Sequence, residues 1–179
     1  MGTLAAFVGP SGAGKDTLME AVHAALPDSH LVRRVITRPT EAGGENFDGV
    51  TVAAFQARAD AGEFVLHWGA HGLYYGIPAS VCDVLEKTPL ALVNLSCGVL
   101  AEAAERFPKL HVLNITATPE VLANRLAGRG RETPEQILKR LSRKPAVFPP
   151  GLRVTDIVNE GTVDQAVARI LLALQPARV

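Results

Sequence analysis

The stretch Gly9-Pro10-Ser11-Gly12-Ala13-Gly14-Lys15-Asp16-Thr17 decides the fold. An apolar run, Leu4 to Val8, comes before it, and apolar residues at helical spacing follow it: Leu18, Val22 and Leu26. Glycines let successive backbone N–H groups turn inward around an anion, and the start of a helix adds the positive end of its dipole. The pattern therefore predicts a strand, a phosphate-binding loop and a helix, with Lys15 reaching the outer phosphates of a nucleoside triphosphate.

The residue after Lys15 departs from the usual loop pattern. Ser or Thr ordinarily stands there and binds magnesium, whereas this chain has Asp16 followed by Thr17. Either the Asp16 carboxylate holds the ion, directly or through water, or Thr17 takes over that role. Both residues are therefore candidate metal ligands.

Composition limits the class of protein. At 179 residues and 47% hydrophobic content, the chain is long enough for one well-packed domain. Its 18 basic and 18 acidic residues balance, so no overall field draws it onto nucleic acid or a membrane. Cys82 and Cys97 show no disulfide or metal spacing, and the first strand begins without a charged leader. We expect a cytoplasmic protein with neither nucleic-acid nor membrane partners, and a homodimer stays open.

Apolar strands separated by helices predict the fold class. Further strands are expected at residues 31–37, 90–95, 110–116 and 154–158, and residues 64–75 form a strand-rich stretch. Helices are expected at residues 52–61, 79–86 and 98–107. Another begins at residue 118, one runs from 133 to Pro145, and the last spans 163–174. This alternation predicts an α/β P-loop NTPase with a parallel sheet core and helices on both faces. Ligands then bind at the carboxyl ends of the strands, where the phosphate-binding loop lies.

We expect a single domain that spans residues 1–179, with two segments that project from its core. The predicted core comprises residues 1–33, 89–123 and 146–179, the acceptor-binding flap residues 34–88, and the lid residues 124–145. Arginines on a mobile lid can neutralise charge in a phosphoryl-transfer transition state and expel water. The alternative for these arginines is a solvated helix face with ion pairs to Glu132 and Glu135.

The acceptor is expected to be a phosphate. No general base stands out for deprotonating an alcohol, and a phosphate acceptor needs none because its oxygen is already anionic. Arg38, in the loop after the strand at 31–37, is the candidate anchor, since a guanidinium pairs bidentately with phosphate. A plain surface role is the alternative for Arg38.

A series of short motifs follows a fixed order: Gly9 to Lys15, Thr37-Arg38-Pro39 with Gly44-Glu45, Gly62-Glu63-Phe64, Gly72-Leu73-Tyr74-Tyr75-Gly76, Arg125-Leu126 with Arg129-Gly130, Arg140-Leu141 and Asp156-Ile157-Val158-Asn159. In this order they resemble the guanylate kinase family over nearly the whole chain. The groups that read guanine in that family are missing. His67 stands in place of the acid, the second acceptor arginine is absent from residues 40–43, and the strand-end aspartate appears as Ser96, preceded by Asn94.

These departures point to a more specific resemblance. Together with Gly14-Lys15-Asp16-Thr17, Gly43-Gly44-Glu45-Asn46 and Val93-Asn94-Leu95-Ser96, they resemble the ribose 1,5-bisphosphate phosphokinase family of phosphonate catabolism. The resemblance implies transfer of the ATP γ-phosphate, with Mg²⁺, to the 1-phosphate of a small phosphorylated sugar, ribose 1,5-bisphosphate. The products would be 5-phosphoribosyl 1-diphosphate and ADP.

The resemblance also implies roles for individual residues. The residues implied to bind the ATP phosphates are Gly9, Pro10, Ser11, Gly12, Ala13, Gly14, Lys15, Asp16 and Thr17. The residues implied to act in catalysis are Lys15, Arg38, Arg129 and Arg140. Arg38, Glu45 and Tyr75 are implied to contact the acceptor, and we add His67 and His71 as candidates for contacts with its sugar or phosphates. A metal site at the two histidines is disfavoured because no acid or cysteine nearby completes a ligand set.

Two other functions stay open at this point. One is a guanylate or other nucleoside monophosphate kinase with an altered base preference. The other is a guanylate-kinase-like module that binds proteins without catalysis. The retained Lys15 and the lid arginines argue against this second alternative.

Overall fold

The computed structural model describes residues 1–40, 45–128, 133, 135–137 and 146–175. Its core is a parallel sheet of five strands in the order β2-β7-β1-β8-β9. These strands are β1 (Thr3–Val8), β2 (His30–Leu31), β7 (Leu90–Asn94), β8 (Leu110–Thr116) and β9 (Arg153–Val158). The inner strands β1, β7 and β8 are mostly buried, as a sheet covered on both faces requires; β1 and β7 are almost wholly apolar, whereas β8 also carries His111, Asn114 and Thr116. The predicted α/β fold is confirmed.

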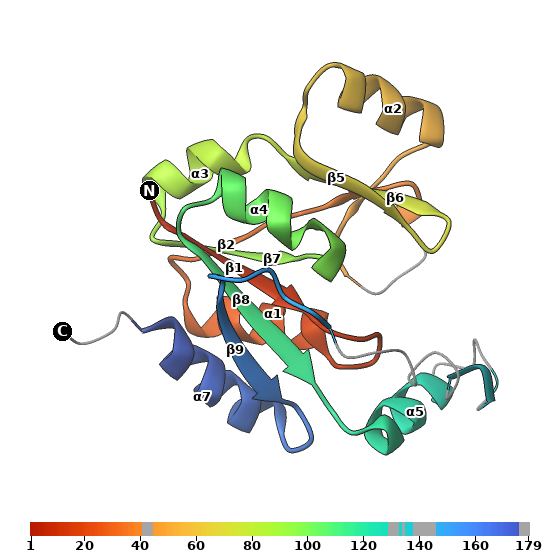
Figure 1. The fold of residues 1–179 in the computed structure, drawn as a ribbon, viewed down its shortest axis with the longest axis vertical. Helices are drawn as coiled ribbons and strands as arrows, with labels where there is room; N and C mark the ends of the chain where they lie inside the picture. Colours follow the sequence, from red (N-terminus) through yellow and green to blue (C-terminus); the bar gives the residue numbers. More distant parts are fainter. Residues whose placement is uncertain (41–44, 129–132, 134, 138–145, 176–179) are drawn as a thin grey trace.

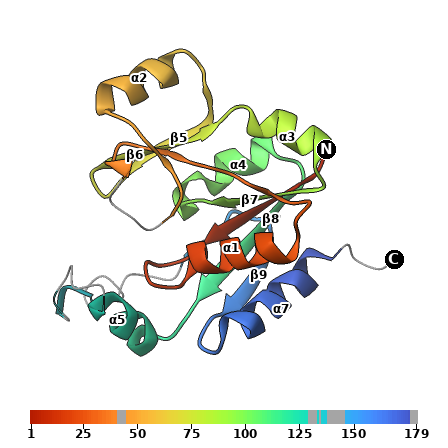
Figure 2. The ribbon, with the colours of Figure 1, turned by 180° about the vertical axis from the view of Figure 1, so that it is seen from behind.

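Helices cover the core sheet on both faces (Figures 1 and 2). On one face, α1 (Lys15–Ala25) and α7 (Val163–Leu174) pack in one apolar cluster with Phe7, Leu92 and Leu113. On the other face, α3 (Val81–Lys87) and α4 (Leu100–Arg106) pack in a second cluster. A short 3-10 turn, η2 (Cys97–Val99), leads from β7 into α4, and α5 (Pro119–Ala127) follows β8. No helix in the described ranges is long and apolar enough to cross a membrane.

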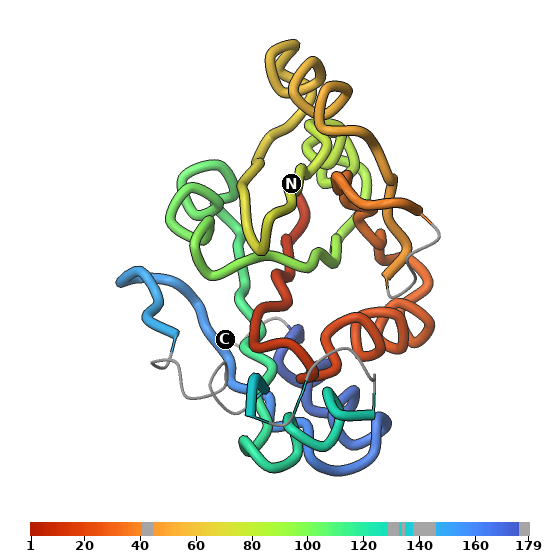
Figure 3. The backbone as a smooth tube through the Cα atoms, turned by 90° about the vertical axis from the view of Figure 1, so that its right-hand side faces the viewer, coloured from red at the N-terminus to blue at the C-terminus, as the bar shows by residue number. Residues whose placement is uncertain are grey.

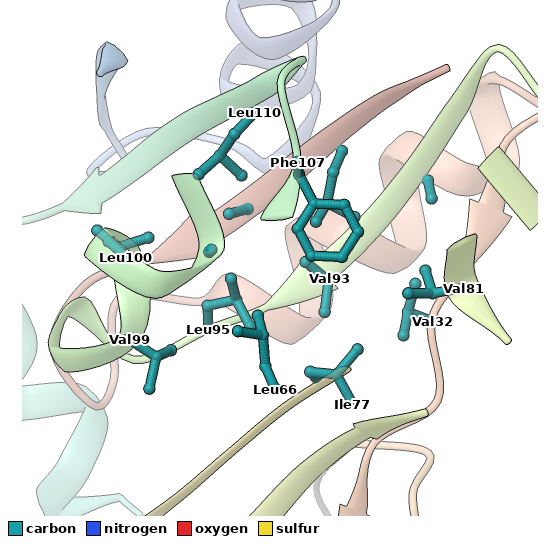
Figure 4. Packing of buried hydrophobic residues seen from close by; sticks show 14 of the residues in the cluster. Val32, Leu66, Ile77, Val81, Val93, Leu95, Val99, Leu100, Phe107 and Leu110 are labelled. Carbon is teal, nitrogen blue, oxygen red and sulfur yellow. The ribbon is translucent and has the colours of Figure 1, made fainter. Parts of the chain in front are cut away.

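A second sheet stands beside the core, in the order β4-β3-β6-β5. Its strands are β3 (Val35–Ile36), β4 (Asp48–Gly49), β5 (Phe64–Ala70) and β6 (Leu73–Pro78), and α2 (Val52–Asp60) lies over it at the end of the molecule far from α5 (Figure 3). Leu66 and Ile77 of this sheet reach into the core cluster that holds Val93 and Phe107 (Figure 4). Apolar burial therefore joins the second sheet to the core.

The segment expected as one strand at residues 31–37 forms two strands in two sheets. Val32 N–H donates to the Leu92 carbonyl of the core sheet at 2.9 Å, whereas the Arg34 carbonyl accepts from Asp48 N–H at 2.8 Å. The chain thus passes from one sheet to the other within three residues. The strand-rich stretch expected at 64–75 forms β5 and the first part of β6, a hairpin that turns at His71 and Gly72, both with positive φ.

Candidate active site

The loop from Gly9 to Gly14 lies at the carboxyl ends of β1 and β8. Gly9 has a φ of 140°, and a Cβ there would lie 2.1 Å from the Ile115 carbonyl oxygen of β8. Only glycine allows this approach, so the loop is pressed against the neighbouring strand. Gly14, with a φ of 91°, then leads into α1. The predicted order of strand, loop and helix is confirmed.

Lys15, the first residue of α1, folds back over the loop. Its Nζ donates to the carbonyls of Gly9 at 2.9 Å and Pro10 at 3.1 Å. Burial lowers the pKa of Lys15, and the nearby Asp16 carboxylate opposes that shift. A half-buried ammonium that bonds neutral carbonyls is poised for an anion, because phosphate oxygens would offset its loss of hydration.

Two side chains from elsewhere in the chain hold the loop in place. Asn159 Nδ2 donates to the Ala13 carbonyl at 2.8 Å, and Arg125 of α5 donates to the Gly12 carbonyl at 3.4 Å and to the Asn159 carbonyl at 2.7 Å. The sequence alone places Arg125 in the predicted lid and indicates no role for Asn159. The structure instead makes both residues supports of the phosphate-binding loop.

Asp16 contacts the end of β7. Its Oδ1 accepts a hydrogen bond of 2.8 Å from Asn94 Nδ2, and Asn94 is buried where its strand ends beside β1. Thr17, one residue further along α1, is exposed. Of the two candidate metal ligands, Asp16 is the one that the structure turns toward the carboxyl ends of the strands.

The face of the second sheet opposite α2 carries a charged cluster of Arg34, Glu45 and Tyr75. Arg34 Nε donates to Glu45 Oε2 at 2.9 Å, and a second nitrogen of the same guanidinium pairs with Oε1. The Arg34 guanidinium lies 5.1 Å from the centre of the Tyr75 ring, which stacks on Trp68 at 5.4 Å. Arg34 and Glu45 act on the pKa of Lys15 in opposite directions, which places the cluster within electrostatic reach of the loop.

The predicted acceptor residues divide between the two faces of this sheet. Glu45 and Tyr75 both contact Arg34, a residue to which the sequence motifs assign no role. The one sign of it in the sequence is the pair of arginines at 33 and 34. Arg38 lies beyond β3 with its guanidinium 4.4 Å from the centre of the Phe47 ring. His67 is exposed on the opposite face of β5 from Trp68, with its ring 6.4 Å from Phe55.

His71 is exposed in the β5–β6 turn, and the structure does not bring either histidine to Tyr75. Arg129 and Arg140, the predicted lid arginines, lie outside the described residues. Within the described part of the chain, no group of three or more His, Cys, Asp or Glu gathers into a metal cluster. A divalent ion would therefore need oxygens from a nucleotide and water besides Asp16, which is how Mg²⁺ is usually bound in kinases.

Comparison with known proteins decides the family. The sequence model of guanylate kinase matches residues 1–176 of the chain. The chain belongs to the guanylate kinase family. The resemblance stated from the sequence motifs is thus confirmed, and members of this family are kinases that use a nucleotide.

Several curated relatives are more than 40% identical to this chain, and their names share one activity. A protein from Ruegeria sp., named ribose 1,5-bisphosphate phosphokinase PhnN, is 47% identical over 99% of this chain and 94% of its own. A protein of the same name from Agrobacterium fabrum is 46% identical over 94% of each chain. A bifunctional ribose 1,5-bisphosphokinase-thymidine phosphorylase from Cupriavidus necator is 43% identical over 97% of this chain and 29% of its own length.

Solved structures resemble the fold of this chain at much lower sequence identity. The crystal structure of guanylate kinase from Anaplasma phagocytophilum covers 94% of this chain and 82% of its own, with a TM-score of 0.71 and 19% identity. A gluconokinase from Sinorhizobium meliloti covers 97% of this chain and 91% of its own, with a TM-score of 0.55 and 17% identity. These similarities concern the fold and not the acceptor.

Proposed function

We propose that this protein is an ATP-dependent ribose 1,5-bisphosphate phosphokinase. The observation that carries the proposal is the 47% identity, over 99% of this chain and 94% of the relative, to a protein of that name. In the proposed reaction an oxygen of the acceptor 1-phosphate bonds to the γ-phosphorus of ATP, and the bond from that phosphorus to the β,γ-bridging oxygen breaks. ADP leaves, and 5-phosphoribosyl 1-diphosphate forms.

The described residues support two halves of such a site. The loop from Gly9 to Gly14 and Lys15 would hold the triphosphate, because backbone N–H groups and a half-buried ammonium both favour phosphate. Magnesium, when bound, would neutralise phosphate charge beside Asp16. Catalysis then consists of orientation and charge stabilisation, without a general base.

The acceptor half would be the second sheet. We assign the acceptor phosphates to Arg38 and Tyr75, and the orientation of the sugar to Glu45, whose carboxylate Arg34 fixes from two nitrogens. A ribose presents hydroxyl donors, and a held carboxylate accepts from them. Arg129 and Arg140 remain proposed transition-state residues, and the flap at 34–88 and the lid at 124–145 remain proposed divisions of one domain.

The acceptor decides the function, so the test compares acceptors. ADP release is measured with ribose 1,5-bisphosphate, GMP, AMP and dGMP in parallel assays, and the sugar product is identified by mass. We expect efficient turnover with the sugar bisphosphate alone, and Lys15→Ala should reduce it by about 10²- to 10³-fold through lost charge stabilisation. Efficient phosphorylation of GMP without turnover of the sugar bisphosphate would overturn the proposal.

A further inference from the structure

We propose that Asp16, oriented by Asn94, is the residue that provides a carboxylate to the magnesium ion of bound ATP, and that Thr17 is not a ligand. The inference rests on the proposed use of ATP but is independent of the acceptor. It resolves the choice between two neighbouring residues that the sequence leaves open.

The usual arrangement in P-loop proteins places a hydroxyl on the loop helix and an acid at a strand end, and both serve the metal ion. Here the helix position carries the carboxylate of Asp16, and the end of β7 carries the neutral amide of Asn94. The two side chains are joined by a hydrogen bond of 2.8 Å. At this point of the structure the negative charge therefore lies on the helix and not on the strand, and the hydrogen bond joins the two elements.

The direction of that hydrogen bond orients the carboxylate. Asn94 donates from Nδ2 to Oδ1 of Asp16, and a carboxylate has about four acceptor positions in all, so most of its capacity remains for a cation and its waters. Asn94 is buried and the last residue of its strand, which makes it a rigid support. A metal-binding carboxylate is commonly held by such an outer partner.

Thr17 is turned elsewhere by helix geometry. Successive residues of an α-helix are rotated by roughly 100° about its axis, so Asp16 and Thr17 cannot both face the end of β7. Asp16 makes that contact, and Thr17 is exposed. One carboxylate, phosphate oxygens and water form a ligand set that suits Mg²⁺.

Calorimetric titration of ATP, with no acceptor present, tests the inference. Affinity is measured once with Mg²⁺ and once with EDTA for the wild type, Asp16→Asn, Thr17→Ala, and the exchange Asp16→Ser with Asn94→Asp. Glu20→Gln is the matched control, because it removes an exposed acid from the same helix one turn later. The thermal unfolding midpoint of each variant is recorded to establish that it is folded.

Asp16→Asn should weaken ATP binding in Mg²⁺ by about tenfold or more. In EDTA the same variant should bind ATP about two- to fivefold more tightly, because a negative charge beside the triphosphate is gone. The exchange variant should regain the magnesium-dependent gain in affinity, and Thr17→Ala and Glu20→Gln should keep it.

Three results would overturn the inference. Asp16→Asn could weaken binding equally with and without Mg²⁺, Thr17→Ala could lose the magnesium-dependent gain, or a folded exchange variant could fail to recover it. None of them bears on the acceptor assay, so this inference and the proposed function can fail separately.

Discussion

Arg34 and Glu45 form the most deeply buried ion pair in the described part of the chain, with side chains only 8% and 11% exposed. The other ion pairs there each leave at least one partner about half exposed or close to it. Removing one partner from a buried pair leaves a desolvated charge without compensation, which costs far more than losing a surface pair. The Glu45 carboxylate is therefore expected to stabilise the fold as well as to fix the position of the Arg34 guanidinium in the proposed acceptor site.

Glu45→Gln should therefore lower the free energy of unfolding by about 3 kcal/mol, because the Arg34 guanidinium loses its counter-charge while the side-chain shape is kept. Urea denaturation at neutral pH measures the change. Glu63→Gln is the control, since it breaks the more exposed pair with Arg58 and should cost less than about 1 kcal/mol. Equal costs for the two variants would show that the Arg34 pair adds no special stability.

Individual residues were predictable where their role is set by local spacing. The loop from Gly9 to Lys15 is fixed by neighbours along the chain, and the sequence located it. Arg34 was missed because its partner, Glu45, lies 11 residues away across a loop. The faces of β5 follow from register with β6, and that register depends on the irregularity between Phe64 and Leu66, so the sequence did not separate His67 from Tyr75.

At the scale of elements, the phosphate-binding loop depends on α5 and on the segment after β9. Arg125 and Asn159 form a chain of hydrogen bonds that reaches the carbonyls of Gly12 and Ala13. These bonds fix the carbonyls of Gly12 and Ala13 and so limit the conformations that the loop can adopt. Preorganisation of this kind raises affinity because less order must be created on binding.

Arg125→Met should weaken ATP binding by about tenfold, in keeping with the loss of one or two hydrogen bonds of about 1 kcal/mol each. The KM for the acceptor should change little, because Arg125 contacts the loop and not the second sheet. Calorimetry with ATP and steady-state kinetics provide the two quantities. Arg106→Met is the control, since Arg106 pairs only with the exposed Glu102. An unchanged ATP affinity in Arg125→Met would contradict the anchoring role.

The long elements were predictable and the short ones were not. Helix α7 shows apolar periodicity over twelve residues and a capping box at Thr162 and Gln165, and such signals are local. The segment at 31–37 looked like one strand because periodicity does not reveal a change of sheet. Its two strands have two residues each, and only the hydrogen bonds to Leu92 and Asp48 distinguish them.

At the scale of the whole molecule, a buried titrating group on the core sheet makes stability depend on pH. His111 of β8 is 1% exposed, and its Nε2 is hydrogen-bonded to Thr155 Oγ1 at 2.9 Å. Burial, and secondly the charge of Arg153, lower the pKa of His111 to about 4 from an ordinary value near 6.5. The folded protein therefore keeps this imidazole neutral at pH values where the unfolded chain protonates it.

The free energy of unfolding should fall as the pH drops below about 6.5, because the unfolded state then binds a proton that the folded state excludes until about pH 4. Between pH 7.5 and 5 the His111 contribution amounts to about 2 kcal/mol. His111→Gln keeps a partner for Thr155 without a titrating group, so urea denaturation should show about that much less loss of stability over this range. His71→Asn, at an exposed turn, should retain the wild-type pH dependence. If His111→Gln loses as much stability as the wild type between the two pH values, proton exclusion at His111 is not the cause, and the acid sensitivity lies in other groups.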